Sequence, residues 1–229
     1  MKADARAEAP PRWPPIAAAI CLGLAIALSL AAMRDDPFPG DLSIILAVQA
    51  PEAPILDSLA WALTRLGRFL PMAAIGGVVA ALVWRRGASN DAAVVVAATL
   101  LYPLNWFLKA LIDRERPADG AAGVFERASG LGFPSGHAFG AMLLFGTMAI
   151  LAASRIGPRM RRATVVAGCL GLALAIGWSR VRLGAHWPSD VLGGWLWGAG
   201  FALLLLVFDA FERVNVGAAL GPRALTESQ

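Results

Sequence analysis

Two cations at helical spacing mark the first of three segments whose residue types suit the chemistry of an anion such as phosphate. Lys109 and Arg116 are seven residues apart, which is two turns of a helix, so both side chains can lie on one face near its end. Pro117 follows directly and ends the helix. Taken alone, Lys109 has a competing explanation as a lysine that extends its ammonium group to a membrane surface.

The second segment, which ends in Ser135, Gly136 and His137, has the pattern of a helix start. Ser135 suits the N-cap position, and the free N–H groups that follow it form an anion site supported by the helix dipole. Gly136 allows a ligand to approach the backbone closely. The competing interpretation is a structural cap beside an incidental histidine.

The third segment runs from Ser179 to Asp190 and contains a histidine with a carboxylate four residues later. In such a pair Asp190 can hold one ring nitrogen of His186 and leave the other free to attack. Arg180 lies just upstream, and its planar fork suits two phosphate oxygens. Each segment alone could be structural, but both histidines of the chain lie in this set. Together the segments therefore indicate phosphoryl chemistry.

The composition places the elements that must position these residues in a membrane. Of the 229 residues 58% are hydrophobic and only 16% are charged, against roughly 25% charged in an average soluble domain. Hydrocarbon is therefore the expected solvent for much of the chain. The pI near 9.8 comes with basic residues scattered between apolar runs, which does not suit a nucleic-acid patch. Cys21 and Cys169 lie inside apolar runs and are expected to be buried as small hydrophobic residues.

We predict an all-α integral membrane bundle of six transmembrane helices. Six apolar stretches are long enough, or nearly so, to cross a hydrocarbon core of about 30 Å; they cover residues 15–33, 69–84, 91–112, 135–153, 163–178 and 187–208. The second and fifth stretches are short for a crossing. Between the first two, helical spacing of apolar residues predicts one or two short amphipathic helices at the interface.

The domain organisation follows from these stretches. A single membrane domain is expected over residues 15–212, between polar tails at 1–14 and 213–229 that are expected to be disordered. The first apolar run is longer than the core of a signal peptide, so an uncleaved first helix is expected.

The distribution of arginine predicts the orientation. Arg155, Arg159, Arg161 and Arg162 form a cluster without a neighbouring acid, which is typical of a cytoplasmic loop. Both tails then lie in the cytoplasm. The three polar segments, and Arg127 between the first two, lie on the opposite side.

The three segments together resemble the signature of the type 2 phosphatidic acid phosphatase superfamily. The chain has Lys-x6-Arg-Pro, then Pro-Ser-Gly-His, then Ser-Arg-x5-His-x3-Asp, and it agrees at every signature position from Lys109 to Asp190. The six-span layout extends the resemblance over most of the chain. Residues 63–67, Leu-Thr-Arg-Leu-Gly, also resemble the sequence that usually precedes the second span in this family.

The resemblance implies a metal-independent mechanism without a cofactor. In it His186 attacks phosphorus and forms a phosphohistidine, Asp190 orients it, and His137 protonates the leaving oxygen. The residues implied in binding the phosphate are Lys109, Arg116, Arg180, Ser135 and Gly136. Two histidines and two cysteines give no support for a zinc site, and no phosphate-binding loop of the nucleotide-hydrolysing type is present in the sequence.

The resemblance also implies the substrate class and the location. Bacterial members that resemble this chain act on undecaprenyl pyrophosphate, phosphatidylglycerophosphate, phosphatidic acid or lipid A phosphates. A multi-pass protein of the bacterial inner membrane is expected, with lipid phosphates and membrane lipids as partners and no nucleic acid. The sequence does not indicate an oligomeric state.

Three other functions remain open at this point. A phosphotransferase that passes the phosphate to a second lipid has identical motifs. A lipid-binding or transport protein on the same fold has no need of His137, His186 and Asp190. Haloperoxidases share the constellation in soluble proteins that hold vanadate, which the apolar spans disfavour.

Overall fold

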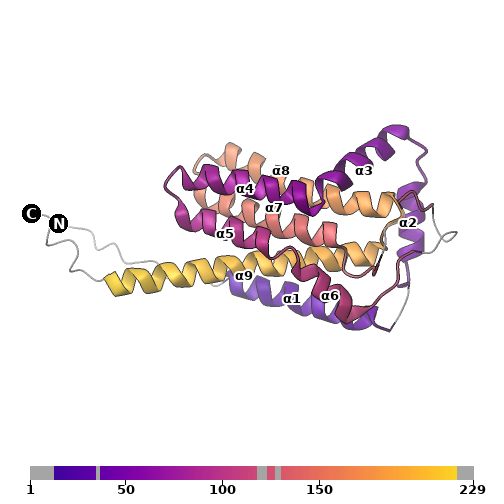
Figure 1. The fold of residues 1–229 in the computed structure, drawn as a ribbon, viewed down its shortest axis with the longest axis horizontal. Helices are drawn as coiled ribbons and strands as arrows, with labels where there is room; N and C mark the ends of the chain where they lie inside the picture. Colours follow the sequence, from indigo (N-terminus) through magenta and orange to yellow (C-terminus); the bar gives the residue numbers. More distant parts are fainter. Residues whose placement is uncertain (1–12, 35–36, 118–122, 127–129, 221–229) are drawn as a thin grey trace, which may run out of the picture.

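The structure is a computed structural model that describes residues 13–34, 37–117, 123–126 and 130–220, with side chains described up to residue 211. The regular structure of this part is helical throughout: α1 (Trp13–Ala32), α2 (Asp41–Gln49), α3 (Pro54–Leu66), α4 (Phe69–Trp84), α5 (Ser89–Leu100), α6 (Leu104–Ile112), α7 (Gly136–Arg155), α8 (Arg159–Arg182) and α9 (Pro188–Leu220). Most of these helices run side by side along one direction, and α2 crosses the end of the bundle (Figure 1).

The predicted all-α membrane bundle is confirmed. Five helical segments are long and apolar enough to cross a membrane, namely α1, α5 with α6, α7, α8 and α9 as far as Phe211. The apolar helix α4 has 16 residues and is the shortest of the six predicted crossings. At 1.5 Å per residue it reaches about 24 Å, so it needs flanking residues to cross a core of about 30 Å.

The predicted third span, residues 91–112, is interrupted by a turn but continues as one candidate crossing, Ser89–Ile112. Helix α5 ends at Leu100 and α6 begins at Leu104, with Pro103 as the residue before it. Proline has no N–H to donate and its ring disturbs the preceding turn, which accounts for the interruption. The break turns Tyr102 inward, where its hydroxyl donates to the carbonyl of Gly67 at 3.0 Å.

The interfacial segment consists of two helices, as the sequence suggested, and α2 and α3 meet at 117°. Arg182 at the end of α8 fixes the corner between them. Its guanidinium donates to the Asp57 carboxylate and to the carbonyls of Val48 and Pro51, each at 2.8 Å. One buried arginine therefore connects the membrane bundle to the segment that covers its end.

Helix α7 is the central element and packs mainly against α8 and α9. Phe139, Leu143 and Phe145 on α7 are buried in the main apolar cluster. A Cβ at Gly198 of α9 would lie 2.5 Å from the carbonyl oxygen of Phe139, so glycine permits the two backbones to approach. The close contact fixes the start of α9 against the start of α7.

The ends of the chain differ in part from the expectation. Helix α9 continues to Leu220, so residues 213–220 are helical rather than disordered. Residues 213–220 contain no proline that would end the helix. The next proline in the chain is Pro222. Residues 1–12 and 221–229 of the predicted tails lie outside the described residues, as does Arg127. Cys21 and Cys169 are half-buried rather than buried, and both are free.

Candidate active site

The three predicted segments meet at one end of the bundle. The end of α6 with the residues after it, the start of α7, the end of α8 and the start of α9 supply the side chains. The turn between α3 and α4 closes the same end. Helix ends placed this way put cations, histidines and free backbone N–H groups next to one another at this end of the bundle.

His186 is held from both sides. Its Nδ1 lies 3.1 Å from Oδ2 of Asp190, and its Nε2 lies 2.9 Å from Nη1 of Arg116. A guanidinium can only donate, so Nε2 must be the acceptor and Nδ1 the nitrogen that carries the proton. His186 is only 1% exposed. Burial, followed by the positive charges of Arg116 and Lys109, lowers the pKa of His186 well below its usual value. The imidazole is therefore neutral, with its lone pair on Nε2.

Asp190 belongs to a buried network of charges. Arg114 donates to Asp190 Oδ1 at 2.9 Å, to Ser189 Oγ at 2.7 Å and to Asp41 Oδ2 at 3.0 Å. The backbone N–H of Trp187 donates to Asp190 Oδ2 at 3.1 Å. The side chains of Arg114 and Asp190 are both 0% exposed. Buried charges persist only when they are paired and hydrogen-bonded, so this network keeps the carboxylate in place beneath His186.

Sequence reasoning missed Arg114 and Asp41. Arg114 has a visible signal, since it stands two residues before Arg116 in the same segment. Asp41 has no such signal in the sequence, because it lies on α2 and contacts the site residues only once the chain has folded. Its Oδ1 accepts the N–H of Ser189 at 2.9 Å and its Oδ2 accepts the hydroxyl of the same residue at 2.6 Å. The interfacial segment therefore contributes a carboxylate to the support of the site.

Arg116 connects the nucleophile candidate to two loops. Its Nε donates to the carbonyl of Gly130 at 2.8 Å, and its Nη1 donates to the carbonyl of Ala185 at 2.7 Å. Burial, with a smaller contribution from the charge of Arg180, lowers the pKa of Arg116 to about 10, which leaves it a cation at neutral pH. The guanidinium is thus fixed over His186 Nε2.

Lys109 lies at the end of α6 and points to the loop before α7. Its Nζ donates to the carbonyls of Leu131 and Gly132 at 2.6 and 2.8 Å. An ammonium group has three donors, and the described residues accept two of them. The competing explanation as a lysine extended to the membrane surface does not describe this inward geometry.

Arg180 lies near the end of α8 and is 1% exposed. Its Nη1 donates to the hydroxyl of Thr64 and to the Glu126 carboxylate. Its Nε has no partner among the described residues. Glu126 occupies part of the fork that the sequence assigned to phosphate, so a phosphate at Arg180 must share or displace that contact.

Ser135 and Gly136 differ in detail from the expectation. Ser135 holds the N-cap position of α7, but its hydroxyl makes no capping hydrogen bond and is buried without a partner in the described part of the chain. A Cβ at Gly136 would lie 2.7 Å from Nδ2 of Asn105. The space that glycine leaves is therefore filled by α6 rather than held open for a ligand.

His137 stands on the first turn of α7, next to the turn between α3 and α4. It forms a hydrogen bond with the backbone of Thr64. A Cβ at Gly67 would lie 2.9 Å from Cδ2 of His137, so the turn between α3 and α4 needs a glycine at this position. The Nε2 of His137 is buried and has no partner within the described ranges.

Five buried polar atoms at this end of the bundle have no partner among the described residues: Asn105 Oδ1, Ser135 Oγ, His137 Nε2, Arg180 Nε and Trp187 Nε1. A buried polar atom without a partner costs roughly 1–3 kcal/mol, so native structures keep few of them. A phosphate would supply acceptor oxygens to the Ser135 hydroxyl and to Arg180 Nε, whereas His137 Nε2 donates to it only when the imidazole is protonated. Among the described residues no three His, Cys, Asp or Glu side chains gather as a metal ion would need.

The sequence model of the PAP2 superfamily matches residues 90–213. The chain belongs to the PAP2 superfamily. The match contains all eight residues predicted for the site, from Lys109 to Asp190, and it contains Arg114. Asp41, Thr64 and Gly67 lie before it, so the support from α2 and α3 is not part of the matched region.

Curated relatives are similar over part of their length. Phosphatidylglycerophosphatase B of Bacillus subtilis is 36% identical over 109 residues, which is 46% of this chain and 51% of that protein. A lipid A 1-phosphatase of Rhizobium johnstonii is 37% identical over 90 residues, or 39% of this chain and 32% of that protein. A putative undecaprenyl-diphosphatase of Escherichia coli, YbjG, is 31% identical over 120 residues, or 51% of this chain and 56% of that protein. The alignments thus span about half of the relatives' length or less.

A solved structure has the same PAP2 architecture. The crystal structure of a transmembrane PAP2 type phosphatidylglycerolphosphate phosphatase from Bacillus subtilis aligns with a TM-score of 0.69 and 25% identity, over 86% of this chain and 96% of that chain. The agreement extends beyond the signature segments, because it covers most of both chains.

Proposed function

We propose that this chain is a membrane lipid phosphatase that hydrolyses a phosphomonoester or pyrophosphate of a lipid through a phosphohistidine. The observation that carries the proposal is the environment of His186. Its Nδ1 faces the Asp190 carboxylate at 3.1 Å, and its Nε2 lone pair faces the cation of Arg116 at 2.9 Å. A neutral imidazole that is oriented by a carboxylate suits a nucleophile whose lone pair becomes free when the neighbouring cation turns to a phosphate oxygen.

The proposed reaction has two steps. In the first, His186 Nε2 attacks phosphorus in line, and the P–N bond forms as the P–O bond to the leaving group breaks. His137, protonated on both ring nitrogens once the phosphate anion is bound, gives its Nε2 proton to the leaving oxygen. In the second, a water molecule gives a proton to His137 and attacks phosphorus from the side of the departed group. The P–N bond breaks, inorganic phosphate forms, and His186 regains its lone pair.

Charge stabilisation is the main contribution expected from the protein. Phosphoryl transfer depends on positioning and on neutralising the charge of the phosphate oxygens. Lys109, Arg116 and Arg180 supply fixed cations, and the start of α7 supplies N–H groups and the positive end of its dipole. This set performs without a metal the role that Mg²⁺ has in many phosphoryl-transfer enzymes.

A lipid is the proposed substrate because of where the site lies. Exposed aromatic residues lie near this end of the bundle: Trp106 and Phe107 on α6 are each 65% exposed, and Phe125 is 56% exposed. Aromatic side chains at a membrane boundary suit a ligand whose tail remains in the bilayer. The names of the relatives support phosphatidylglycerophosphate, undecaprenyl pyrophosphate or another lipid phosphate, and phosphatidic acid belongs to the same class.

The proposal is tested with the purified protein in detergent and a panel of these lipid phosphates and pyrophosphates. Phosphate release is expected with at least one lipid, undiminished by EDTA, since side-chain cations fill the phosphate site. Vanadate is expected to inhibit, because its five-coordinate form resembles the in-line transition state. Complete loss of release in EDTA, restored by magnesium or zinc, would contradict the metal-free mechanism. Phosphate that appears only on an added lipid acceptor would instead identify a phosphotransferase.

We further propose that the chain lies in the bacterial inner membrane with the active site on the extracytoplasmic face and both termini in the cytoplasm. Two residues mark the opposite ends of the bundle. Phe125 lies beside the site and is 56% exposed, and Arg159 lies at the start of α8. In a background with Cys21→Ser and Cys169→Ser, an impermeant maleimide added to intact cells is expected to label Phe125→Cys and not Arg159→Cys. The opposite labelling pattern would place the active site in the cytoplasm.

A further inference from the structure

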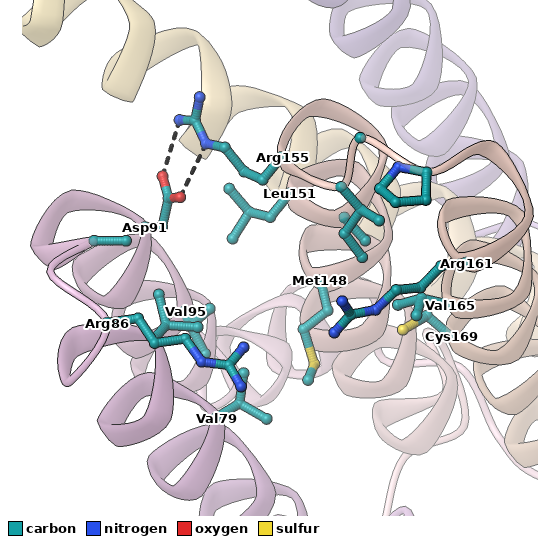
Figure 2. Close-up of a pocket in the computed structure, with 16 residues that line it drawn as sticks. Val79, Arg86, Asp91, Val95, Met148, Leu151, Arg155, Arg161, Val165 and Cys169 are labelled. Carbon is teal, nitrogen blue, oxygen red and sulfur yellow. Dashed lines mark hydrogen bonds and ion pairs between the residues drawn. The ribbon is translucent and has the colours of Figure 1, made fainter.

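A second cavity lies at the end of the bundle opposite to the active site. It has a volume of about 440 Å³ and is enclosed by α4, α5, α7 and α8 (Figure 2). Its apolar walls are formed by Val79, Val83, Val95, Met148, Val165 and Cys169. Helix α7 begins at the active site with His137 and ends at this cavity with Arg155, so about 27 Å of helix separates the two. The cavity is therefore not an extension of the active site.

Three arginines, Arg86, Arg155 and Arg161, line the mouth of this cavity. Arg155 is already paired, since its Nε and Nη2 each donate to the Asp91 carboxylate at 2.9 Å. Arg86 and Arg161 have no ion pair within the described part of the chain. Figure 2 shows these two side chains extending from opposite walls toward each other, with Met148 between them. The mouth thus carries two positive charges that the described residues do not neutralise.

The α4 wall of the cavity adjoins a surface suited to hydrocarbon. On α4, Val78 is 60% exposed and Leu82 is 54% exposed, next to the residues that line the apolar wall. A small soluble anion would use the arginines alone and leave the apolar wall without a partner. A ligand with an anionic head and an apolar tail satisfies both, and the volume is within the range of about 300–1,000 Å³ that small-molecule sites occupy.

We propose that this cavity binds an anionic phospholipid of the leaflet opposite to the active site. The headgroup phosphate lies between the guanidinium groups of Arg86 and Arg161, and an acyl chain lies along Val79, Val165 and Met148. Arginine forks suit phosphate oxygens, and juxtamembrane cations attract anionic lipids. The proposed lipid site is separate from the proposed substrate site.

The test compares two double variants with the same loss of charge. Arg86→Gln with Arg161→Gln removes the cations of the cavity. Arg85→Gln with Arg162→Gln is the matched control, because these neighbours in sequence do not line it. Binding of phosphatidylglycerol and of phosphatidylcholine with identical chains is measured by native mass spectrometry. The cavity variant is expected to weaken phosphatidylglycerol binding by about thirtyfold, at roughly 1 kcal/mol for each arginine. The control is expected to bind as the parent does.

Cys169 provides an independent measurement because it lines the cavity. In a Cys21→Ser background, phosphatidylglycerol is expected to slow alkylation of Cys169 by N-ethylmaleimide. The protection should be lost in the Arg86→Gln, Arg161→Gln variant and recovered in part with lysine at both positions. Equal protection by phosphatidylcholine or by inorganic phosphate would overturn the assignment to an anionic lipid. Equal weakening in the Arg85, Arg162 control would overturn the assignment to this cavity. Thermal unfolding in lipid-free detergent shows whether the variants are folded.

Discussion

His186→Ala is expected to abolish turnover together with any acid-labile phosphoenzyme. The substitution removes Nε2, the nitrogen that lies 2.9 Å from Arg116 and that forms the P–N bond in the proposed reaction. No other imidazole can replace it, because His137 is the only other histidine of the chain. The measurement is single-turnover trapping of phosphoenzyme from a labelled lipid phosphate, followed by acid treatment.

His137→Ala is the informative partner of that variant. His137 is proposed to protonate the leaving oxygen, so its loss should matter most for a poor leaving group such as a lipid alkoxide. With an activated leaving group such as nitrophenolate, little protonation is needed, and phosphoenzyme should still form at an appreciable rate. If both variants lose phosphoenzyme equally with every leaving group, the division of roles between the two histidines is wrong.

Arg116→Ala is expected to lower kcat/KM by about 10²–10³, as the loss of one oxyanion-stabilising donor does in other enzymes. The guanidinium is proposed to bind the phosphate, and it holds the carbonyls of Gly130 and Ala185 beside His186. Arg116→Lys should recover only part of the activity, since an ammonium lacks the planar fork that serves several acceptors at once. Steady-state kinetics on one lipid phosphate measure both variants.

Arg65→Ala is the matched control for Arg116. Arg65 is an exposed arginine in the last turn of α3, near the same end of the bundle. Its loss should change kcat/KM by less than about threefold, as expected for a solvated surface charge. A loss of activity in Arg116→Ala that is no larger than this would show that Arg116 does not act on the phosphate. Thermal unfolding of each variant separates a loss of chemistry from a loss of structure.

The membrane helices were predictable because a helix needs a minimum length to cross the hydrocarbon core. A backbone that crosses a membrane must satisfy its own hydrogen bonds, so apolar runs of sufficient length become helices with few alternatives. The same rule does not say where a helix bends. Pro103 was visible within the predicted span of residues 91–112, but proline in a membrane helix can be tolerated, kink the helix or break it, and packing decides which.

The residues of the site were predictable where spacing along the chain corresponds to proximity. His186 and Asp190 are four residues apart at the start of α9, and their side chains meet. The prediction that Lys109 and Arg116 share one helix is wrong, because α6 ends at Ile112 and Asp113 is left-handed at φ 55°; Arg116 reaches the site from the segment that follows. Asp41 was not predictable, because its contact with Arg114 forms only after α2 folds across the end of the bundle. Arg180 and Arg182 show a further limit. They are two residues apart, yet one faces the candidate active site and the other holds the corner of α2 and α3. Their sequence positions do not distinguish these roles.

The contact between Arg116 and His186 Nε2 bears on selectivity before any substrate arrives. While the guanidinium donates to Nε2, the lone pair is occupied and is a poor base and a poor nucleophile toward neutral electrophiles. A neutral ester offers no charge to attract the cation away. A phosphate does, because its oxygens are better acceptors for the fork than an imidazole nitrogen. The same arginine that binds the phosphate would thereby release the nucleophile, so that reactivity depends on the arrival of an anionic ligand.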